Sequence, residues 1–205
     1  MKRVSCLILA AALALALAAC GEAPLSGDAA WSTLENANTL YLTGNLNDVN
    51  TSSDITADGK VIGQVQEKGL INNTMVVTVD GKEQFYYRYA KDDEFWNDAG
   101  TTYVCCDMDG NCLGYMHLLF AKGTSYYAFC DAERNEKGYY LDEELTTFTN
   151  ASGEPIGSVE AALDNIVTSS FHVEIKTFAT QEKIDYTDKL AVYWSAVSLL
   201  NSRYG

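Results

Sequence analysis

Four cysteines in the middle of the chain are the side chains with the clearest capacity for chemistry. Cys105, Cys106, Cys112 and Cys130 follow a hydrophobic N-terminal segment, and an even number of cysteines in an exported chain favours disulfides over free thiols. If residues 107–111 form a hairpin loop, Cys106 lies opposite Cys112 on one face of the hairpin, within bonding distance. The sequence therefore predicts a Cys106–Cys112 disulfide.

The other two cysteines are expected to remain unpaired. In the same register Cys105 and Cys130 share the opposite face, but a turn at Lys122-Gly123 places Cys130 across from Tyr115. Two strand spacings, roughly 10 Å, then separate Cys105 from Cys130, which is too far for a disulfide. A bulge would change this register, and a tight two-residue turn would instead place Cys112 across from Asp107.

Metal binding by these residues is the alternative, with His117 as a fifth ligand candidate. Structural zinc sites usually contain pairs of cysteines two to four residues apart, and this spacing does not occur among the four cysteines. The segment Asp107–Asn111 alternates oxygen donors like a calcium loop, but Cys112 and Leu118 occupy the positions that require glycine and glutamate. A hairpin turn is the better interpretation, and neither a metal nor another cofactor is predicted.

Residues for catalysis are sparse. The two histidines, His117 and His172, both lie in strand-like stretches, and none of the common nucleophile, zinc-protease or phosphate-loop motifs is present. Carboxylates are plentiful in residues 92–94 and 143–144, but nothing in the sequence selects a pair for glycoside hydrolysis. A catalytic function is therefore not favoured, and a carboxylate-dependent hydrolase is the least favoured alternative.

Tyrosine-rich stretches are the remaining signal for a ligand site. In the sequence FYYRY, residues 85, 87 and 89 share one face of a strand and residues 86 and 88 share the other, so one set of rings can face solvent or a ligand. Alternatively, tyrosine is simply common in sheets, where its ring covers a neighbour and its hydroxyl meets water. The candidate ligand-binding aromatic residues are Tyr86, Tyr87, Tyr89, Trp96, Tyr126 and Tyr127.

The elements that would position these residues are mainly β-hairpins between about residues 40 and 145. Turn signals occur at Asp58-Gly59, Asp80-Gly81, Asp109-Gly110, Lys122-Gly123 and Gly138, each between β-rich runs. Such regular spacing is typical of an antiparallel meander.

The C-terminal part has a different pattern. Apolar residues from Val159 to Val167 recur at helical spacing after a possible N-cap at Ser158, residues 171–178 alternate like a strand, and a second helical stripe begins near Thr187. The predicted fold class is α+β: an antiparallel meander, as a curled sheet or half-barrel, with one or two C-terminal helices packed on it.

The N-terminus resembles that of bacterial lipoproteins. Lys2 and Arg3 precede an apolar run over residues 7–19, which is too short to span a bilayer but fits a secretory leader. Leu17-Ala18-Ala19-Cys20 resembles the lipobox, which implies cleavage after residue 19 and attachment of lipid to Cys20. The alternative is an ordinary signal peptide with a chance cysteine. Gly21, where aspartate would favour the inner membrane, points to the outer membrane if the host has one.

Length and charge limit the remaining organisation. Residues 20–30 would be the lipidated cysteine and a tether, and residues 31–205 a single domain large enough for one core. Removal of residues 1–19 takes away two of the 14 basic residues and none of the 28 acidic ones, which leaves a formal net charge of −16. This charge repels phosphate backbones and therefore disfavours nucleic-acid binding.

These observations favour a membrane-anchored, extracytoplasmic lipoprotein with a non-enzymatic domain that binds a glycan or an apolar small molecule. The layout resembles that of lipoproteins that carry apolar ligands in a half-barrel, although no motif residues are shared. The alternative is a structural or protein-interaction module of the cell envelope. The expected location is the cell membrane or outer membrane, facing away from the cytoplasm.

Overall fold

Antiparallel strands and two helices make up the part of the protein that the structure describes. A computed structural model describes residues 25–46, 52–68, 74–91, 102–121, 123–178 and 183–204. The bounds of the elements are α2 Gly27–Asn36, β1 Thr39–Asn45, β2 Ser52–Ala57, β3 Lys60–Lys68, β4 Thr74–Val79, β5 Lys82–Tyr89, β6 Thr102–Asp107, β7 Cys112–Ala121, β8 Thr124–Asp131, β9 Glu136–Asp142, β10 Thr147–Asn150, β11 Pro155–Asn165, β12 Ser170–Thr177 and α3 Tyr186–Tyr204.

The strands close into a barrel rather than an open sheet. Each strand pairs with the strands before and after it in sequence, and β12 pairs with β1, from Thr39 opposite Lys176 to Asn45 opposite Ser170. Closure gives every strand of this ladder a partner on both sides over at least part of its length, so the sheet has no edge strand. The α+β class with a C-terminal helix is confirmed, whereas the predicted curled sheet or half-barrel is replaced by a closed barrel.

The predicted Asp-Gly turns are confirmed. Asp58 and Asp80 have φ angles of 45° and 53°, and the glycine after each also has a positive φ. A turn with two such residues matches the right-handed twist of the flanking strands, which is why the sequence locates these hairpins well. Gly138, in contrast, lies within β9, and the turn before it spans Asp131 to Asn135.

The helix predicted around residues 158–167 is wrong. This segment is the long strand β11, which pairs with β12 from Gly157 opposite Thr177 to Asn165 opposite Ser170 and with β10 on its other side. Val159 faces the core whereas Ala161 and Leu163 are only half-buried near the end of the strand. The spacing of these few apolar residues fits both periods, and pairing with β12 along the segment decides for the strand.

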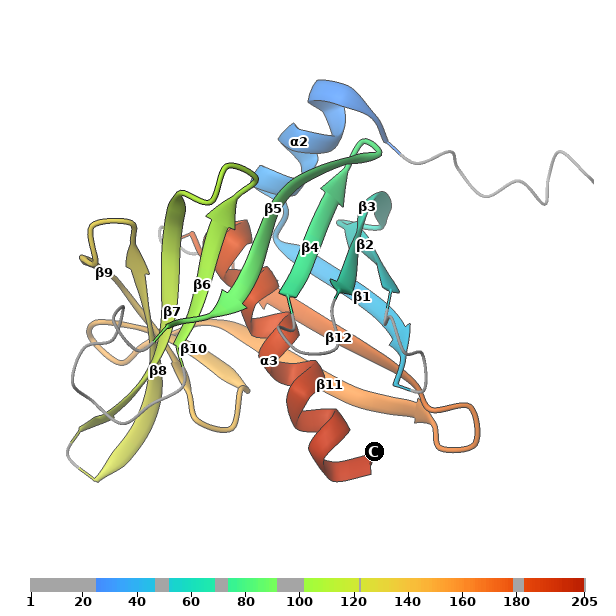
Figure 1. Ribbon diagram of the computed structural model, residues 1–205. Helices are drawn as coiled ribbons and strands as arrows, with labels where there is room; N and C mark the ends of the chain where they lie inside the picture. The colour runs from blue at the N-terminus through green and yellow to red at the C-terminus, as the bar shows by residue number, and fades with distance from the viewer. Residues whose placement is uncertain are drawn as a thin grey trace, which may run out of the picture.

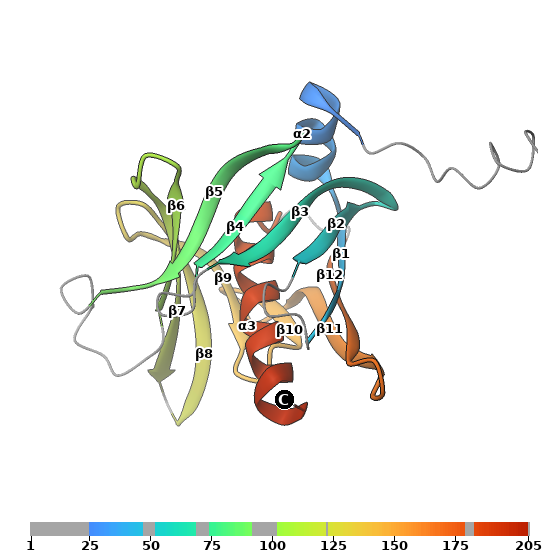
Figure 2. The same ribbon diagram turned by 45° about the vertical axis from the view of Figure 1, so that its right-hand side comes forward.

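Helix α3 fills the interior of the barrel instead of packing on an outer face. Figures 1 and 2 show the strands surrounding it, with α2 at one end and the C-terminus at the other. Every residue from Asp188 to Val197 is buried, so all sides of the helix are covered. A helix enclosed by a sheet has no solvent face, so polar residues such as Lys189 and Ser195 hydrogen-bond to groups inside the barrel.

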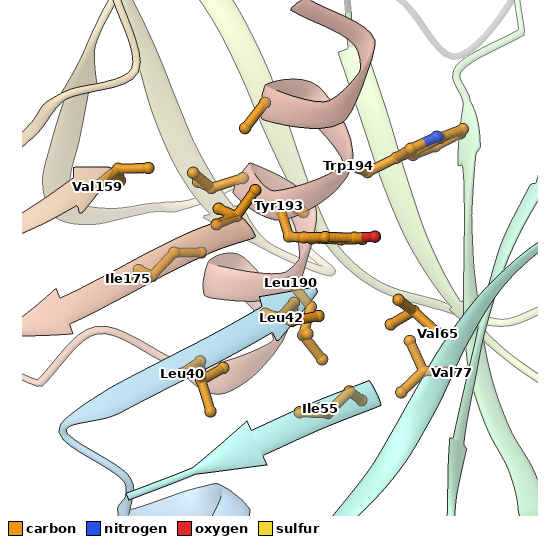
Figure 3. Packing of buried hydrophobic residues seen from close by; sticks show 14 of the residues in the cluster. Leu40, Leu42, Ile55, Val65, Val77, Val159, Ile175, Leu190, Tyr193 and Trp194 are labelled. Carbon is orange, nitrogen blue, oxygen red and sulfur yellow. The ribbon is translucent and has the colours of Figure 1, made fainter. Parts of the chain in front are cut away.

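The core is formed where α3 meets the inward-facing side chains of the strands. Figure 3 shows Leu190, Tyr193 and Trp194 of the helix among side chains such as Leu42 and Val65 from the surrounding strands. Inward and outward residues alternate along the strands, as expected for a barrel. The interior is therefore a packed core rather than an open channel.

Helix α2 covers one end of the barrel, and it begins within the stretch predicted as a tether. It starts at Gly27, and its buried residues Ala30 and Leu34 belong to the main core. Lys189 of α3 is buried below it and donates a hydrogen bond from Nζ to the carbonyl oxygen of Ala37 at 2.7 Å. Burial lowers the pKa of Lys189 to about 8. Among the described residues, neither helix is long and apolar enough to cross a bilayer.

Candidate functional site

An aromatic cluster lies where α3 passes the ends of β5, β6 and β8. It consists of Tyr89, Tyr103, Tyr127 and Trp194 with Ser195, and is called the aromatic mouth below. The ring centroids of Tyr89, Tyr103 and Trp194 lie 5.1–5.3 Å from one another. Such distances are typical of favourable ring packing, so the cluster forms a rigid apolar surface.

One member of the aromatic mouth faces solvent. Tyr89 is 44% exposed, although it follows Phe85 and Tyr87 on the inward face of β5. It is the last residue of the strand, where the barrel wall ends and an inward side chain becomes accessible. Tyr103 and Trp194 lie buried beneath it, so they support Tyr89 from below and fix the orientation of its ring.

Hydroxyl groups give this apolar surface a polar component. Ser195 Oγ donates a hydrogen bond to the Tyr103 hydroxyl oxygen at 3.3 Å, and Ser195 also interacts with the hydroxyl of Tyr127. Burial raises the pKa of Tyr103 and of Tyr127, so both phenols stay protonated at neutral pH and can donate as well as accept. The nearby carboxylate of Glu143 adds negative charge beside Tyr127.

The predicted ligand-binding aromatic residues do not form one surface. Tyr89 and Tyr127 belong to the aromatic mouth, whereas Tyr87 is enclosed in the barrel and donates a hydrogen bond to the carbonyl oxygen of Thr187 at 2.5 Å. Tyr126 lies on the outer face, where its ring packs edge-on against Tyr140 at 5.4 Å. Tyr86 is half-buried, also on the outer face, and Trp96 lies outside the described residues.

The sequence did not identify Tyr103, Trp194 and Ser195 as site residues. Tyr103 is a single tyrosine between Thr102 and Val104, and Trp194 and Ser195 belong to a helix whose stripe predicted only core packing. The one available signal was that serine interrupts the apolar run of this helix, which indicates a polar partner inside the barrel. The three residues meet only because β6 and α3 lie side by side in the closed barrel.

A bulge in β6 changes which cysteines lie on the same face of the sheet. Cys106 lies opposite Cys112 as predicted, and Cys130 lies opposite Tyr115 as predicted. A bulge between β6 and β7 then places Val104, not Tyr103, across from Tyr115. Cys130 therefore shares the outer face with Cys106 and Tyr115, and the predicted shared face of Cys105 and Cys130 is wrong.

All four cysteines are present as thiols in this structure. Cys105 is buried inside the barrel, and burial raises its pKa. Burial also raises the pKa of Cys130, to about 11, so this thiol is poorly reactive at neutral pH. The register supports the Cys106–Cys112 bridge, which stays a prediction. In the described residues no three histidine, cysteine or acidic side chains are grouped closely enough to bind a metal ion.

The two histidines and the turn at Asp107 have local structural partners. His117 is buried beside the hydroxyl of Thr102, and His172 Nδ1 lies 2.5 Å from the carboxylate of Asp164 on the outer face. The Asp107 carboxylate accepts hydrogen bonds from the backbone and side-chain nitrogens of Asn111. These bonds lower the pKa of Asp107 and close the hairpin turn.

A second cluster of ionisable side chains lies where α3 begins. Lys137 Nζ is 2.8 Å from a carboxylate oxygen of Asp185 and 2.8 Å from one of Asp188, and the Tyr139 hydroxyl donates to Asp188 at 2.5 Å. Burial raises the pKa of Asp188 to about 6, although Lys137 and Tyr139 oppose the shift. The contacts join α3 to β9, so we interpret this cluster as an anchor of the helix.

Comparison with known proteins identifies no relative of this chain. No protein-family model matches the chain, and no curated protein or solved structure is significantly similar to it.

Proposed function

We propose that this protein is a lipid-anchored, extracytoplasmic binding protein without catalytic activity, and that its ligand binds at the aromatic mouth. The exposed ring of Tyr89, supported by Tyr103 and Trp194 and bordered by protonated hydroxyls, carries this proposal. Helix α3 occupies the interior of the barrel, so a ligand has access at this end rather than in the lumen.

A neutral glycan fits this chemistry best. The C–H face of a sugar ring stacks on an aromatic side chain, and its hydroxyls can exchange hydrogen bonds with the hydroxyls of the exposed Tyr89 and the half-buried Tyr127. Glu143 and the formal net charge of −14 for the whole chain disfavour an anionic ligand. The ligand class that we propose is therefore an uncharged or basic glycan.

Replacement of Tyr89 by alanine tests the binding proposal. The Tyr89→Ala variant should bind neutral oligosaccharides about tenfold more weakly, because loss of one stacking ring removes about 1.4 kcal/mol. The measurement is calorimetric titration of a panel of gluco- and N-acetylglucosamine oligosaccharides, with tryptophan emission recorded in parallel.

Tyr41→Ala is the matched control for this experiment. Tyr41 is a comparably exposed tyrosine, at 37%, but it stacks on His172 on the outer face of the barrel. Its removal should leave the affinity unchanged. Equal losses in the two variants, or no binding of any oligosaccharide by the unmodified protein, would contradict a glycan site at the aromatic mouth.

The anchoring part of the proposal rests on the lipobox and has a separate test. Cys20→Ser should move the protein from the membrane fraction to the soluble fraction, because serine cannot form the thioether that carries the lipid. Cell fractionation followed by mass spectrometry of the N-terminal peptide measures both the location and the lipid. Cys6→Ser is the control: it changes a cysteine of the leader instead, and the protein should remain membrane-bound. If the Cys20→Ser protein also remained in the membrane fraction, lipidation of Cys20 would be contradicted.

A protein-interaction module is the second candidate function. Two hairpins that project at the end opposite α2 carry strongly exposed apolar residues: Phe120 on β7–β8, and Ile166 and Val167 at the turn of β11–β12. Exposed apolar side chains on projecting hairpins are common at protein interfaces. This function would be favoured if mutation of these residues abolished a cellular phenotype that Tyr89→Ala leaves intact.

A further inference from the structure

The β7–β8 hairpin continues the aromatic mouth beyond the barrel wall. The described ladder between β6 and β7 ends where Thr102 lies opposite His117, whereas β7 and β8 continue to pair as far as Ala121 and Thr124. Figures 1 and 2 show this hairpin projecting past the neighbouring strands. Among the described residues, its outer part therefore extends the surface that begins at the aromatic mouth.

On the inner face of this projecting hairpin, β7 contributes apolar side chains, and Ser125 of β8 lies opposite the outermost of them, Phe120. Met116 faces the core, so the two-residue period of the strand places Leu118 and Phe120 on the same inward side. Leu118 lies directly opposite Tyr127, which belongs to the aromatic mouth. Leu118 is half-buried, and Phe120 is 74% exposed. We call Leu118 and Phe120 the apolar wall.

The aromatic mouth and the apolar wall differ in chemistry although they are continuous. The aromatic mouth presents the rings and hydroxyls of the exposed Tyr89 and the half-buried Tyr127, whereas Leu118 and Phe120 have no polar side-chain atoms. A purely sugar-like ligand would make no contact with Phe120, and a purely aliphatic ligand would exclude water from these two hydroxyls without replacing the lost hydrogen bonds. Only a ligand with both kinds of group matches the whole surface.

We infer that the ligand is an amphiphile whose hydroxylated head occupies the aromatic mouth and whose aliphatic arm lies along the apolar wall. This inference rests on the proposed function and narrows its ligand class from glycans in general to glycans with an apolar substituent. One side of the aliphatic arm contacts the hairpin, and the other side of the arm remains in solvent. Each methylene should therefore contribute about half of its full burial energy, which is about a twofold gain in affinity.

The test uses alkyl glucosides as probes. The chain from Gly21 onward, which contains every helix and strand of the described structure, is titrated with methyl, butyl, hexyl and octyl β-glucoside below their micelle concentrations. We expect the affinity to rise about twofold per methylene. In Phe120→Ser the dependence on chain length should largely disappear, while the affinity for methyl glucoside stays unchanged. Tyr89→Ala should lower the affinity for all four probes by a similar factor.

Met108→Ser is the matched control, because Met108 is also an exposed apolar residue, at 46%, but belongs to the turn between β6 and β7. This variant should bind the whole series like the unmodified protein. Equal affinity for all four glucosides, or equal weakening of methyl and octyl glucoside by Phe120→Ser, would overturn the amphiphile inference and leave the glycan site intact.

Other outcomes would reject the aromatic mouth itself. Failure of every glucoside to bind would overturn both the proposed function and the inference that depends on it. Binding of octyl glucoside that Tyr89→Ala does not change would do the same, because the head would then lie elsewhere. If Phe120 contacts a protein partner instead, Phe120→Ser should leave all four affinities unchanged, and this result would overturn the amphiphile inference.

Discussion

A chain that ends at Glu182, and therefore lacks α3, is expected not to form the barrel. The helix contributes eleven buried residues, including the large apolar side chains Leu190, Tyr193 and Trp194. Burial of its six largest apolar side chains stabilises the fold by roughly 10–15 kcal/mol, which is comparable to the whole stability of a typical domain. The strands would also enclose an empty lumen, which closely packed proteins do not tolerate.

Thermal unfolding followed by near-ultraviolet circular dichroism measures this effect. The shortened chain should show no cooperative transition, whereas the full chain should unfold in one step. A chain that ends at Leu200 is the matched control, since it loses only the last turn of α3, which contains no buried residue. It should unfold within a few degrees of the full chain. A cooperative transition in the chain that ends at Glu182 would show that the barrel is stable without its central helix.

Replacement of Lys137 by methionine is expected to cost about 3–5 kcal/mol at pH 7.5. The side chain of Asp188 is only 7% exposed, and Lys137 is its cationic partner at 2.8 Å. Loss of one member of a buried ion pair leaves an uncompensated buried charge, which strongly destabilises the folded state. Tyr139 alone would then hydrogen-bond this carboxylate. Chemical denaturation of the variant and of the unmodified protein gives the difference in unfolding free energy.

The pH dependence of this loss follows from the direction of the pKa shift. Burial raises the pKa of Asp188 to about 6 from an ordinary value of 3.8, so the folded state binds this proton more tightly than the unfolded state. Stability from this group is therefore greatest below pH 4 and is lost as the pH rises through 6. Without Lys137 the pKa should rise further, so the variant should recover most of its stability at pH 4.5.

Asp188→Asn provides the control for the ion pair. Asparagine has nearly the same shape but no charge, so this change should abolish the pH dependence between 4 and 6 and restore much of the stability of Lys137→Met when the two are combined. An equal loss in Lys137→Met at pH 4.5 and 7.5 would contradict the electrostatic explanation and indicate that only packing was lost.

Local chemistry in the sequence determined the hairpins. Turns such as Asp58-Gly59 and Asp80-Gly81 require positive φ angles that few other residue pairs adopt readily, so their positions could be predicted without knowledge of the fold. The same holds for Cys106 opposite Cys112, because a five-residue loop fixes the register beside it. The strand β12 and the start of α3 near Thr187 were also predictable, from clear periods of two and of 3.6 residues.

Tertiary contacts decided the assignments that local patterns left ambiguous. Residues 158–167 matched a helix in spacing, but pairing with β12 makes the segment a strand as far as Asn165. The bulge at Cys105–Cys106 is a second case, because it depends on how β6 and β7 fit together and it moves Cys130 to a different face from the predicted one.

The sequence by itself therefore determined the acidic charge and several of the hairpins, because a hairpin turn depends on neighbours in the chain. The closed barrel, the insertion of α3 and the aromatic mouth were decided only by the tertiary structure. Tyr89, Tyr103 and Trp194 come from three elements, and the sequence carries no pattern that links a strand to a helix some 90 residues later. They meet because closing the barrel leaves a lumen that only the C-terminal helix fills.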